Sequence, residues 1–442
     1  MATLRPFRGL RYDPRRVPDL SLVIAQPYDR IHAAEQAAYY ALHPWNFVRI
    51  DMGQTEPDQP DDNVYTRARA YAETWQTEGV LAREPRPALY AVEQAFASAD
   101  GRLRTRMGFT AALELTRFDE GVILPHERTL SGPKSDRLNL TRATQTAWGH
   151  IFVLYPDPDN QIAGLLRAHL SGKPPIIARE RVIEPEVEQR MWVIDDGEVI
   201  AEVIRRLAPL RNLIIADGHH RYESALAYRD EMRARHPQAP AAAFNHALAT
   251  FVSMSDPGLA ILPTHRLIHS YTRLTGDQVL AASAPFFDVQ PVPGRAALIR
   301  GLEQAGARPG ETRFGFYRRG AHAVLTLRSP AAMAQLAPER DPAWRALDVS
   351  VLHKIVLERT MGLTQDSIAR QENIRYLRDA QAGFMAVDRG EADFLFVLNP
   401  TRMDQVRACT AAGEIMPQKS TDFYPKIVSG WVSLPLDSQE LS

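Results

Sequence analysis

The residues best suited to chemistry form one short stretch, residues 217–221, whose sequence is Asp-Gly-His-His-Arg. It follows the apolar run 213–216, which has the composition of a strand buried on both faces. The residues after it have helical periodicity, so we expect a strand that turns directly into a helix. Free amides and the helix dipole attract anions at such a turn, which therefore predicts a phosphate or carboxylate site.

Each residue of this stretch suits a different task. Asp217 can cap the helix, take a hydroxyl proton or help to hold Mg²⁺, and Gly218 lets a ligand approach the backbone. His219 and His220 suit proton transfer, and Arg221 can clamp a phosphate. A capped helix with two hydrogen-bonded structural histidines is the alternative. Four polar residues and a glycine after a buried strand favour function, so the acid, the histidines and the arginine are our candidate catalytic residues.

A metal site is not assigned at this stretch. Adjacent histidines point in different directions, and neither a cysteine nor a second histidine at helical spacing completes a ligand shell.

A second polar segment, residues 124–137, is predicted to be a loop. An imidazole beside a carboxylate suits proton transfer, and a lysine and an arginine further on suit phosphate. A solvated charged loop is the alternative. The candidate phosphate- or substrate-binding residues here are His126, Glu127, Thr129, Lys134 and Arg137.

The segment 416–426 has the same character: two lysines, two hydroxyls and an aromatic pair are fixed by prolines and could hold a charged small molecule. Its candidate binding residues are Lys419, Ser420, Thr421 and Lys426. The polar turn 263–266 is a weaker candidate. The sequence contains no Walker A loop, Gly-x-Gly-x-x-Gly, His-Glu-x-x-His or Gly-x-Ser-x-Gly, so the common nucleotide and hydrolase templates do not apply.

Composition describes an ordinary globular chain. Its 442 residues exceed the size of one core, about 250–300 residues, so we expect two or three domains. A net charge of -1 gives no basic excess, so neither nucleic acid nor a membrane surface is an expected partner. A single cysteine, Cys409, excludes a disulfide within the chain and is expected to be a packing residue. No signal-like or membrane-length apolar run occurs, so we expect a soluble, cytoplasmic protein.

The pattern along the chain predicts an α/β fold (α+β, with mixed sheets) in several domains. Residues 182–235 alternate strand, helix, strand and helix, which is typical of α/β proteins. Further expected elements are strands at 21–31, 45–53 and 427–436, helices at 32–43 and 64–75, and a hairpin around residues 99–101.

Six motifs together resemble a widespread prokaryotic family that is catalogued as a domain of unknown function: RPFRGLRYDP, AQPYD, LPHERTLSGPKSDRL, IADGHHRYESAL, ILPTHRL and MPQKSTDFYPK. The resemblance extends from Arg5 to Pro435. Gln26 stands where the family usually has a second proline, which we expect to alter a turn rather than the chemistry.

The stretch 213–226 is also similar to the signature of free serine kinases on the ParB-like nuclease scaffold. In those enzymes the motif opens a helix that holds nucleotide phosphates, with its acidic and histidine residues around the transferring group. A separate upstream glutamate is their base. Here Asp195, Asp196 and Glu198 precede the strand, at a shorter spacing than that glutamate.

Three domains follow from this resemblance and from the Pro- and Gly-rich break near residue 175. They are an N-terminal α+β domain (1–175) with the loop 124–137, a ParB-like core (176–270) with the motif 217–221, and a C-terminal α/β domain (271–442) with the loop 416–426.

The function that the resemblance implies is phosphoryl transfer to a small molecule. We expect a nucleotide-dependent kinase of free serine or a similar hydroxyl compound, with ATP or ADP as donor and Mg²⁺ as cofactor. Its partners would be the small-molecule substrate and the nucleotide. Two alternatives stay open: a phosphohydrolase acting on phosphoserine or a related phosphate ester, and a non-catalytic, nucleotide-binding regulatory protein.

Overall fold

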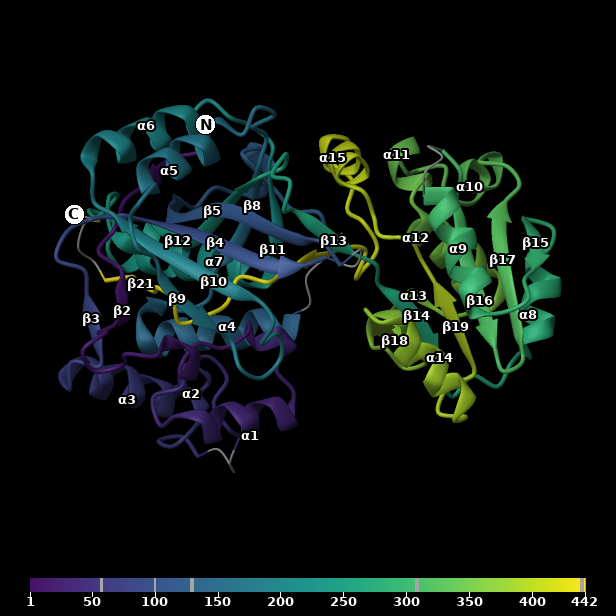
Figure 1. Cartoon of the computed structure of the whole chain (residues 1–442), viewed down its shortest axis with the longest axis horizontal. Helices are drawn as coiled ribbons and strands as arrows, with labels where there is room; N and C mark the ends of the chain where they lie inside the picture. The colour runs from purple at the N-terminus through teal and green to yellow at the C-terminus, as the bar shows by residue number, and fades with distance from the viewer. Residues whose placement is uncertain (56–58, 99–100, 128–130, 307–309, 438–440, 442) are drawn as a thin grey trace. The chain divides into compact units, whose positions relative to one another are not determined.

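The computed structural model describes the chain except residues 56–58, 99–100, 128–130, 307–309, 438–440 and 442. It has the expected mixed α/β fold with several sheets (Figure 1). The chain divides into two compact units. The first comprises Met1–Pro125, Thr129–Ala260 and Pro425–Ser442, and the second His126–Arg128 and Ile261–Tyr424.

The first unit is organised by one mixed sheet. Its strands are hydrogen-bonded in the order β6 (Ile123–Leu124), β11 (Leu213–Asp217), β8 (Ile151–Tyr155), β12 (His246–Ser253), β5 (Leu103–Glu114), β4 (Leu89–Ala97), β10 (Glu188–Ile194) and β9 (Ile176–Arg179), with β1 (Leu4–Arg5) also on β5. The pairs β6–β11 and β8–β12 are parallel and the others antiparallel. Strands from both sides of residue 175 share this sheet, so the domain boundary expected there is wrong.

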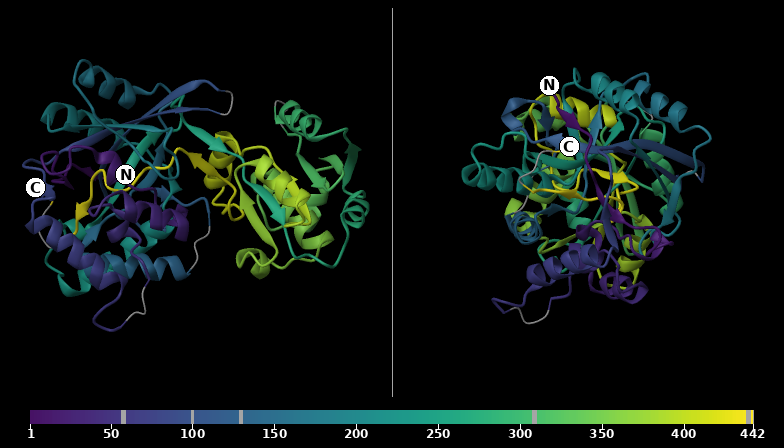
Figure 2. Two further views of the ribbon diagram at one scale, coloured as in Figure 1. Left: turned by 60° about the horizontal axis from the view of Figure 1, so that its bottom comes forward. Right: turned by 90° about the vertical axis from the view of Figure 1, so that its left-hand side faces the viewer.

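Helices cover both faces of this sheet (Figures 1 and 2). On one face lie α5 (Gln161–Leu170) and α6 (Gly197–Leu207), which bury apolar residues at helical spacing against it. On the other lie α3 (Val64–Thr77), α4 (Ser131–Thr144) and α7 (His219–Arg235). Side chains alternate between the faces along β4, where Tyr90 joins the core under α3 and Leu89 the core under α5.

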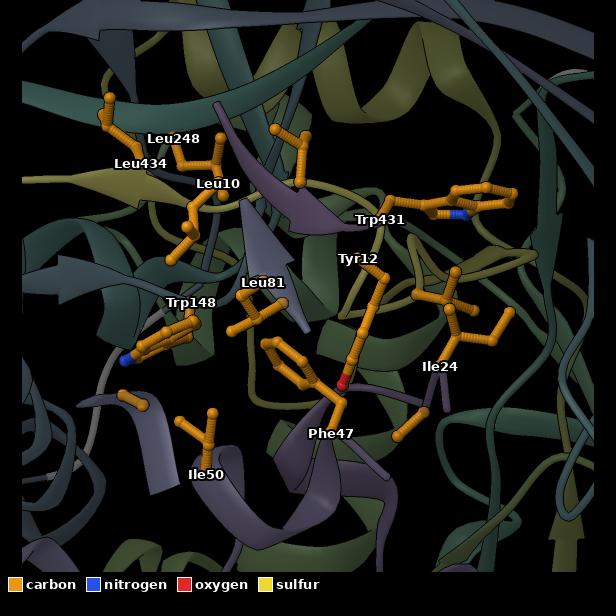
Figure 3. Packing of buried hydrophobic residues seen from close by; sticks show 14 of the residues in the cluster. Leu10, Tyr12, Ile24, Phe47, Ile50, Leu81, Trp148, Leu248, Trp431 and Leu434 are labelled. Atoms are coloured by element: carbon orange, nitrogen blue, oxygen red, sulfur yellow. The ribbon is translucent and has the colours of Figure 1, made fainter. Parts of the chain in front are cut away.

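The expected strand at 45–53 is wrong, because this segment contains the helical turn α2 (Val48–Asp51). The Asn46 side chain accepts a hydrogen bond from the Val48 amide at 3.0 Å and so starts a turn. Phe47 and Ile50 then reach the same core (Figure 3). A short apolar run does not distinguish a buried strand from a buried helical turn.

The expected strand at 21–31 is also wrong, since it consists of the 3₁₀ turns η1 (Leu20–Leu22) and η2 (Tyr28–Arg30) around the bridge of Ala25 to Ser429. The expected helices 32–43 and 64–75 are confirmed as α1 (Ala33–Leu42) and α3.

The C-terminal segment returns to the first unit and packs into its core. Only β21 (Leu434–Pro435) of the expected strand 427–436 forms, on β7 (Thr146–Ala147), because Ser429 and Ser433 hydrogen-bond separate partners, Ala25 and Leu10. Trp431 and Leu434 lie in the cluster around β2 (Leu10–Tyr12) and β3 (Leu81–Arg83) (Figure 3).

The second unit is built on an antiparallel sheet. Its strand order is β15 (Phe287–Pro291), β17 (Ala321–Leu327), β16 (Arg313–Arg318), β19 (Phe394–Val397), β14 (His265–Ile268) and β18 (Ile374–Leu377). Apolar residues of α9 (Arg295–Gly306) and α14 (Ala380–Asp388) pack on it. The remaining elements include α8 (Gly276–Ser283), α10 (Ala331–Leu336), α11 (Pro342–Arg345), α12 (Asp348–Val351), the π-helical η5 (Leu352–Thr360), α13 (Gln365–Ala369), α15 (Met403–Ala411) and β20 (Asp422–Tyr424), which pairs with β13 (Ala260–Leu262).

Two expectations from composition can be compared with these elements. Cys409 is fully buried in α15, and burial raises the pKa of its thiol to about 12, so it is the packing residue that was expected. None of the described helices has both the length and the apolar character of a membrane span.

A hydrogen-bonded polar chain in the first sheet gives a stability prediction. Thr110 and Thr250 face each other on β5 and β12 with their hydroxyl oxygens 2.8 Å apart, and His150 Nδ1 lies 2.8 Å from the Thr250 hydroxyl. All three are buried. Thr250→Val keeps the shape but leaves two buried polar groups unpaired, so we expect a loss of about 1–3 kcal/mol, measured by urea denaturation. Thr250→Ser, which keeps the hydroxyl, should lose less; equal stability of the valine variant and the wild type would contradict this.

Candidate functional site

The turn at residue 217 has the expected strand-to-helix geometry. The pairing of β11 with β8 shifts register between Ile215 and Asp217, a bulge at the strand end of the kind that re-aims side chains beside functional sites. Gly218 follows in the left-handed region (φ 91°, ψ 28°), which favours glycine, and α7 begins at His219. Gly218 is the N-cap and no side chain caps the helix, so the expected capping role of Asp217 is wrong.

The Asp217 carboxylate instead binds two cations. Its Oδ1 accepts a hydrogen bond from Lys426 Nζ at 2.9 Å, and its Oδ2 one from Arg221 Nη2 at 2.5 Å. The three side chains are only 17%, 12% and 9% exposed for Asp217, Lys426 and Arg221. Burial alone would raise the pKa of Asp217, but the two cations outweigh it and lower that pKa far below its usual range. The carboxylate is therefore charged and fully engaged, with one net positive charge left over in the group.

Two glycines make room for the Arg221 guanidinium. A Cβ on Gly149 would lie 3.1 Å from its Cδ, and a Cβ on Gly218 3.1 Å from its Nε. Arg221 Nη1 also donates to the backbone carbonyl of His150. Burial, reinforced by the Arg221 cation, lowers the pKa of His150 to about 3, so this imidazole is neutral near pH 7.

A second group of charged residues, centred on Arg137, lines the same cavity as Arg221. Arg137 forms ion pairs with Asp51 at 2.7 Å and Asp136 at 2.6 Å, and its guanidinium lies 3.9 Å from the centre of the Tyr28 ring. Burial raises the pKa of Asp51, against the attraction of Arg137 and Arg221. A cavity of about 50 Å³ is lined by Asp51, Arg137 and Arg221, with apolar residues of α4, β7 and β12. The Arg137 guanidinium is thus paired with two carboxylates of the protein itself, whereas the sequence predicted that it would bind phosphate.

The segment around Arg137 is not the loop that was expected. Residues 131–137 form the first two turns of α4. Lys134 forms an ion pair with Glu223 at 2.7 Å, and its backbone carbonyl accepts a hydrogen bond from the Ser224 hydroxyl at 2.9 Å. Both contacts join α4 to α7. Thr129 lies outside the described residues.

The two histidines of the motif differ in exposure. His219 is buried, and its electrostatic interaction with Asp217 is one of those that lower the pKa of that carboxyl, so it belongs to the same group. His220 is half-buried, and its backbone carbonyl accepts a hydrogen bond from the Ser224 hydroxyl at 2.7 Å.

In the second unit, the segments 126–127 and 416–421 meet in a polar cluster. His126 Nε2 lies 2.6 Å from the Thr421 hydroxyl. Glu127 Oε1 accepts hydrogen bonds from the amides of Ser420 and Thr421 at 3.1 and 3.3 Å. The backbone amides therefore hold a carboxylate, which is the geometry of an anion-binding loop.

Arg266 hydrogen-bonds the backbone of the same loop, residues 416–421. Its Nη2 donates to the backbone carbonyls of Gln418 and Lys419 at 3.3 and 3.0 Å, and its side chain is fully buried. Lys419 is exposed at the tip, with a left-handed φ of 56°. The turn 263–266 was a weak candidate from the sequence. Through Arg266 it positions the loop 416–421, which is a stronger candidate.

The described residues do not form a metal centre by themselves. They contain no group of three or more His, Cys, Asp and Glu side chains that could hold an ion. Both oxygens of Asp217 are occupied by cations, so the expected help of this residue in holding Mg²⁺ does not fit its geometry.

The structure thus distributes the predicted residues among three settings. Asp217, Arg221 and Lys426 form one ion group, close to His219. His126, Glu127, Ser420 and Thr421 form a second cluster with the Lys419 backbone, whereas Lys134 and Arg137 join α4 to its neighbours. Sequence reasoning missed the surrounding Tyr28, Asp51, Gly149 and His150; of these only Tyr28 lies in a quoted motif, AQPYD.

Comparison with known families decides where the chain belongs. Residues 4–350 match the family described as Protein of unknown function (DUF1015). The chain belongs to this family. The membership inferred from the six motifs is therefore confirmed, and no curated protein matches this DUF1015 chain.

Several solved structures are similar to the DUF1015 chain. A conserved hypothetical protein from Pyrococcus furiosus is 12% identical over 72% of this chain and 94% of that one, with a TM-score of 0.34. A free serine kinase variant in complex with ADP is 11% identical over 72% and 90%, with a TM-score of 0.36. C-terminally truncated SbnI from Staphylococcus aureus is 10% identical over 73% and 87%, with a TM-score of 0.34. At these values the similarities assign no residue roles.

The Glu127 contacts generate a testable prediction. Glu127→Ala removes the acceptor of two loop amides, so the loop should open more often and trypsin should cut after the exposed Lys419 faster, by about tenfold if one such contact is worth about 1.5 kcal/mol. Cleavage is followed by mass spectrometry. Glu339→Ala, an exposed glutamate of the same unit, is the control. Unchanged cleavage after Lys419 in the Glu127 variant would contradict the role given to this carboxylate.

Proposed function

We propose that this protein is a small-molecule phosphotransferase, a nucleotide-dependent kinase of free serine or a similar hydroxyl compound. The observation that carries the proposal is the group formed by Asp217, Lys426 and Arg221 at the start of α7. Its two cations lie where a helix N-terminus already favours negative charge. The motif's resemblance to free serine kinases supplies the acceptor class.

The chemistry asked of these residues is mainly electrostatic. Phosphoryl transfer needs the phosphate oxygens held in line while charge spreads over them. Lys426 and Arg221 are largely buried, and charges in such a setting act more strongly on a phosphate than they would in water. Gly218 has no side chain, which leaves room for the Arg221 guanidinium beside the start of α7.

Asp217 has a positioning role in this proposal rather than that of a base. Since its carboxylate is charged and bound to both cations, it fixes their direction before the phosphate arrives. The acceptor hydroxyl then forms a bond to the terminal phosphorus of ATP or ADP, and the bond from that phosphorus to its bridging oxygen breaks, which releases ADP or AMP. The hydroxyl proton passes to an imidazole. We assign that proton to His219 or His220, the imidazoles of the first helical turn.

The cofactor that we propose is Mg²⁺, and only as part of its complex with the nucleotide. Because the described residues form no metal centre of their own, we propose that Mg²⁺ arrives bound to the nucleotide phosphates. The cluster of His126, Glu127, Ser420 and Thr421 with Lys419 is proposed as a substrate-binding element of the second unit.

The test is whether the purified full chain forms phosphoserine from serine, Mg²⁺ and either ATP or ADP. The product is monitored by ³¹P NMR. Lys426→Gln and Arg221→Gln should each lower the rate by about a hundredfold or more, because each removes a donor to the developing charge. Lys173→Gln, an exposed lysine of the same unit, should leave the rate unchanged. Thermal melting of each variant checks that it is folded, so that a lost rate can be assigned to the missing donor.

The other outcomes separate the alternatives. Phosphate release from phosphoserine without nucleotide would select a phosphohydrolase. Nucleotide binding without turnover would select a regulatory protein. A chain that neither binds nucleotide nor forms phosphoserine would overturn the kinase assignment.

A further inference from the structure

A groove of about 460 Å³ lies on the first sheet, and none of the predicted site residues lines it. Its floor is one cross-strand row: Ile177 of β9 faces Arg190 of β10, which faces Glu93 of β4, which faces Met107 of β5. The end of α5 and the following turn form one wall, through Arg167, Leu170, Ser171 and Pro175, and Trp192 completes the lining. The volume is that of sites that bind small organic molecules.

The cations of this groove are not equivalent. Arg190 is engaged, with ion pairs to Glu93 at 2.8 Å and Glu188 at 2.6 Å. Arg167 is 39% exposed and donates no hydrogen bond to any residue that the structure describes. It forms an ion pair with the buried Asp256, whose Oδ2 lies 3.6 Å from Arg167 Nη2.

Asp256 is already committed to the backbone. Its carboxylate accepts hydrogen bonds from the amides of Gly258 at 2.8 Å and Met107 at 3.3 Å, and it is buried. Arg167 thus has an ionic partner but no hydrogen-bond acceptor among the described residues, so its N–H groups can bind an acid from outside. A guanidinium binds a carboxylate with two parallel hydrogen bonds, which is the geometry that these N–H groups offer.

The apolar part of the lining is held in place. Ile177 is 53% exposed, whereas Leu170 in the wall and Met107 on the floor are buried. The Trp192 indole donates to the Lys173 carbonyl at 3.0 Å, so its ring stands as a fixed wall.

We propose that this groove binds a small amphipathic carboxylate, with its acidic head on Arg167 and its aromatic or branched apolar body between Ile177, Leu170 and Trp192. The N–H groups of Arg167 and the apolar side chains of Ile177, Leu170 and Trp192 complement a molecule that has one negative charge and an apolar body. Arg190 and Glu93 on the floor pair with each other. The site is independent of the phosphotransferase assignment, since none of its residues belongs to the Asp217 group or to the cluster around Glu127.

The test is isothermal titration of the full chain with 2-naphthoate, and with 2-naphthylmethanol as the uncharged match. We expect saturable binding of one naphthoate and much weaker binding of the alcohol. Arg167→Gln should weaken naphthoate binding by about tenfold or more, because a charged hydrogen-bonding partner is lost. Ile177→Asp, at an exposed position, should do the same by replacing apolar surface with a like charge.

The control is Arg86→Gln, an exposed arginine of the same unit that does not line the groove, which should bind naphthoate like the wild type. Phosphoserine formation should be unchanged in Arg167→Gln, so failure of one proposal does not imply failure of the other. Absence of saturable naphthoate binding, equal affinity for the alcohol, or unchanged affinity in both groove variants would overturn the proposal.

Discussion

A buried carboxylate between two cations is the constraint on which the first unit depends. Asp217 is removed from water at the end of β11, which is unfavourable unless its charge is paired. Arg221 supplies one partner from the next helical turn, and Lys426 the other from 209 residues away. That long link is reinforced, because the Lys426 carbonyl accepts a hydrogen bond from Gln94 at 2.8 Å. The pairing therefore joins the C-terminal segment to the sheet and leaves a cationic group at the helix start.

The same balance separates the candidate cations that are neutralised within the protein from those that keep a net positive charge. Arg137 is consumed by Asp51 and Asp136, and Lys134 by Glu223, so these cations stabilise helix packing. In the groove, Arg167 has an ionic partner, Asp256, but donates no hydrogen bond to any described residue. Charge alone therefore does not identify a binding residue. What distinguishes one is the charge that remains after pairing: Arg137 is paired with two acids, whereas Arg221 and Lys426 share the single carboxylate of Asp217.

Local patterns predicted much of the fold and the centre of the site. The apolar run before Asp217 and the periodicity after Arg221 are properties of adjacent residues, so the strand-to-helix turn followed from them. Lys426 was named as a binding residue, but its pairing with Asp217 depends on the tertiary fold. The boundary near residue 175 failed for a related reason: strand pairing across it joins β9 and β10 to earlier strands. At 45–53, the hydrogen bond from the Val48 amide to the Asn46 side chain favours a helical turn over a strand.

The most direct test of the central claim, that the Asp217 group binds phosphate, is the affinity of the full chain for ADP, measured by isothermal titration calorimetry with Mg²⁺. The account predicts saturable binding that Lys426→Gln weakens by about tenfold or more, since one charge-assisted contact to phosphate is lost. Lys173→Gln should bind ADP like the wild type. Equal affinity of the Lys426 variant and the wild type, with both folded, would contradict the claim.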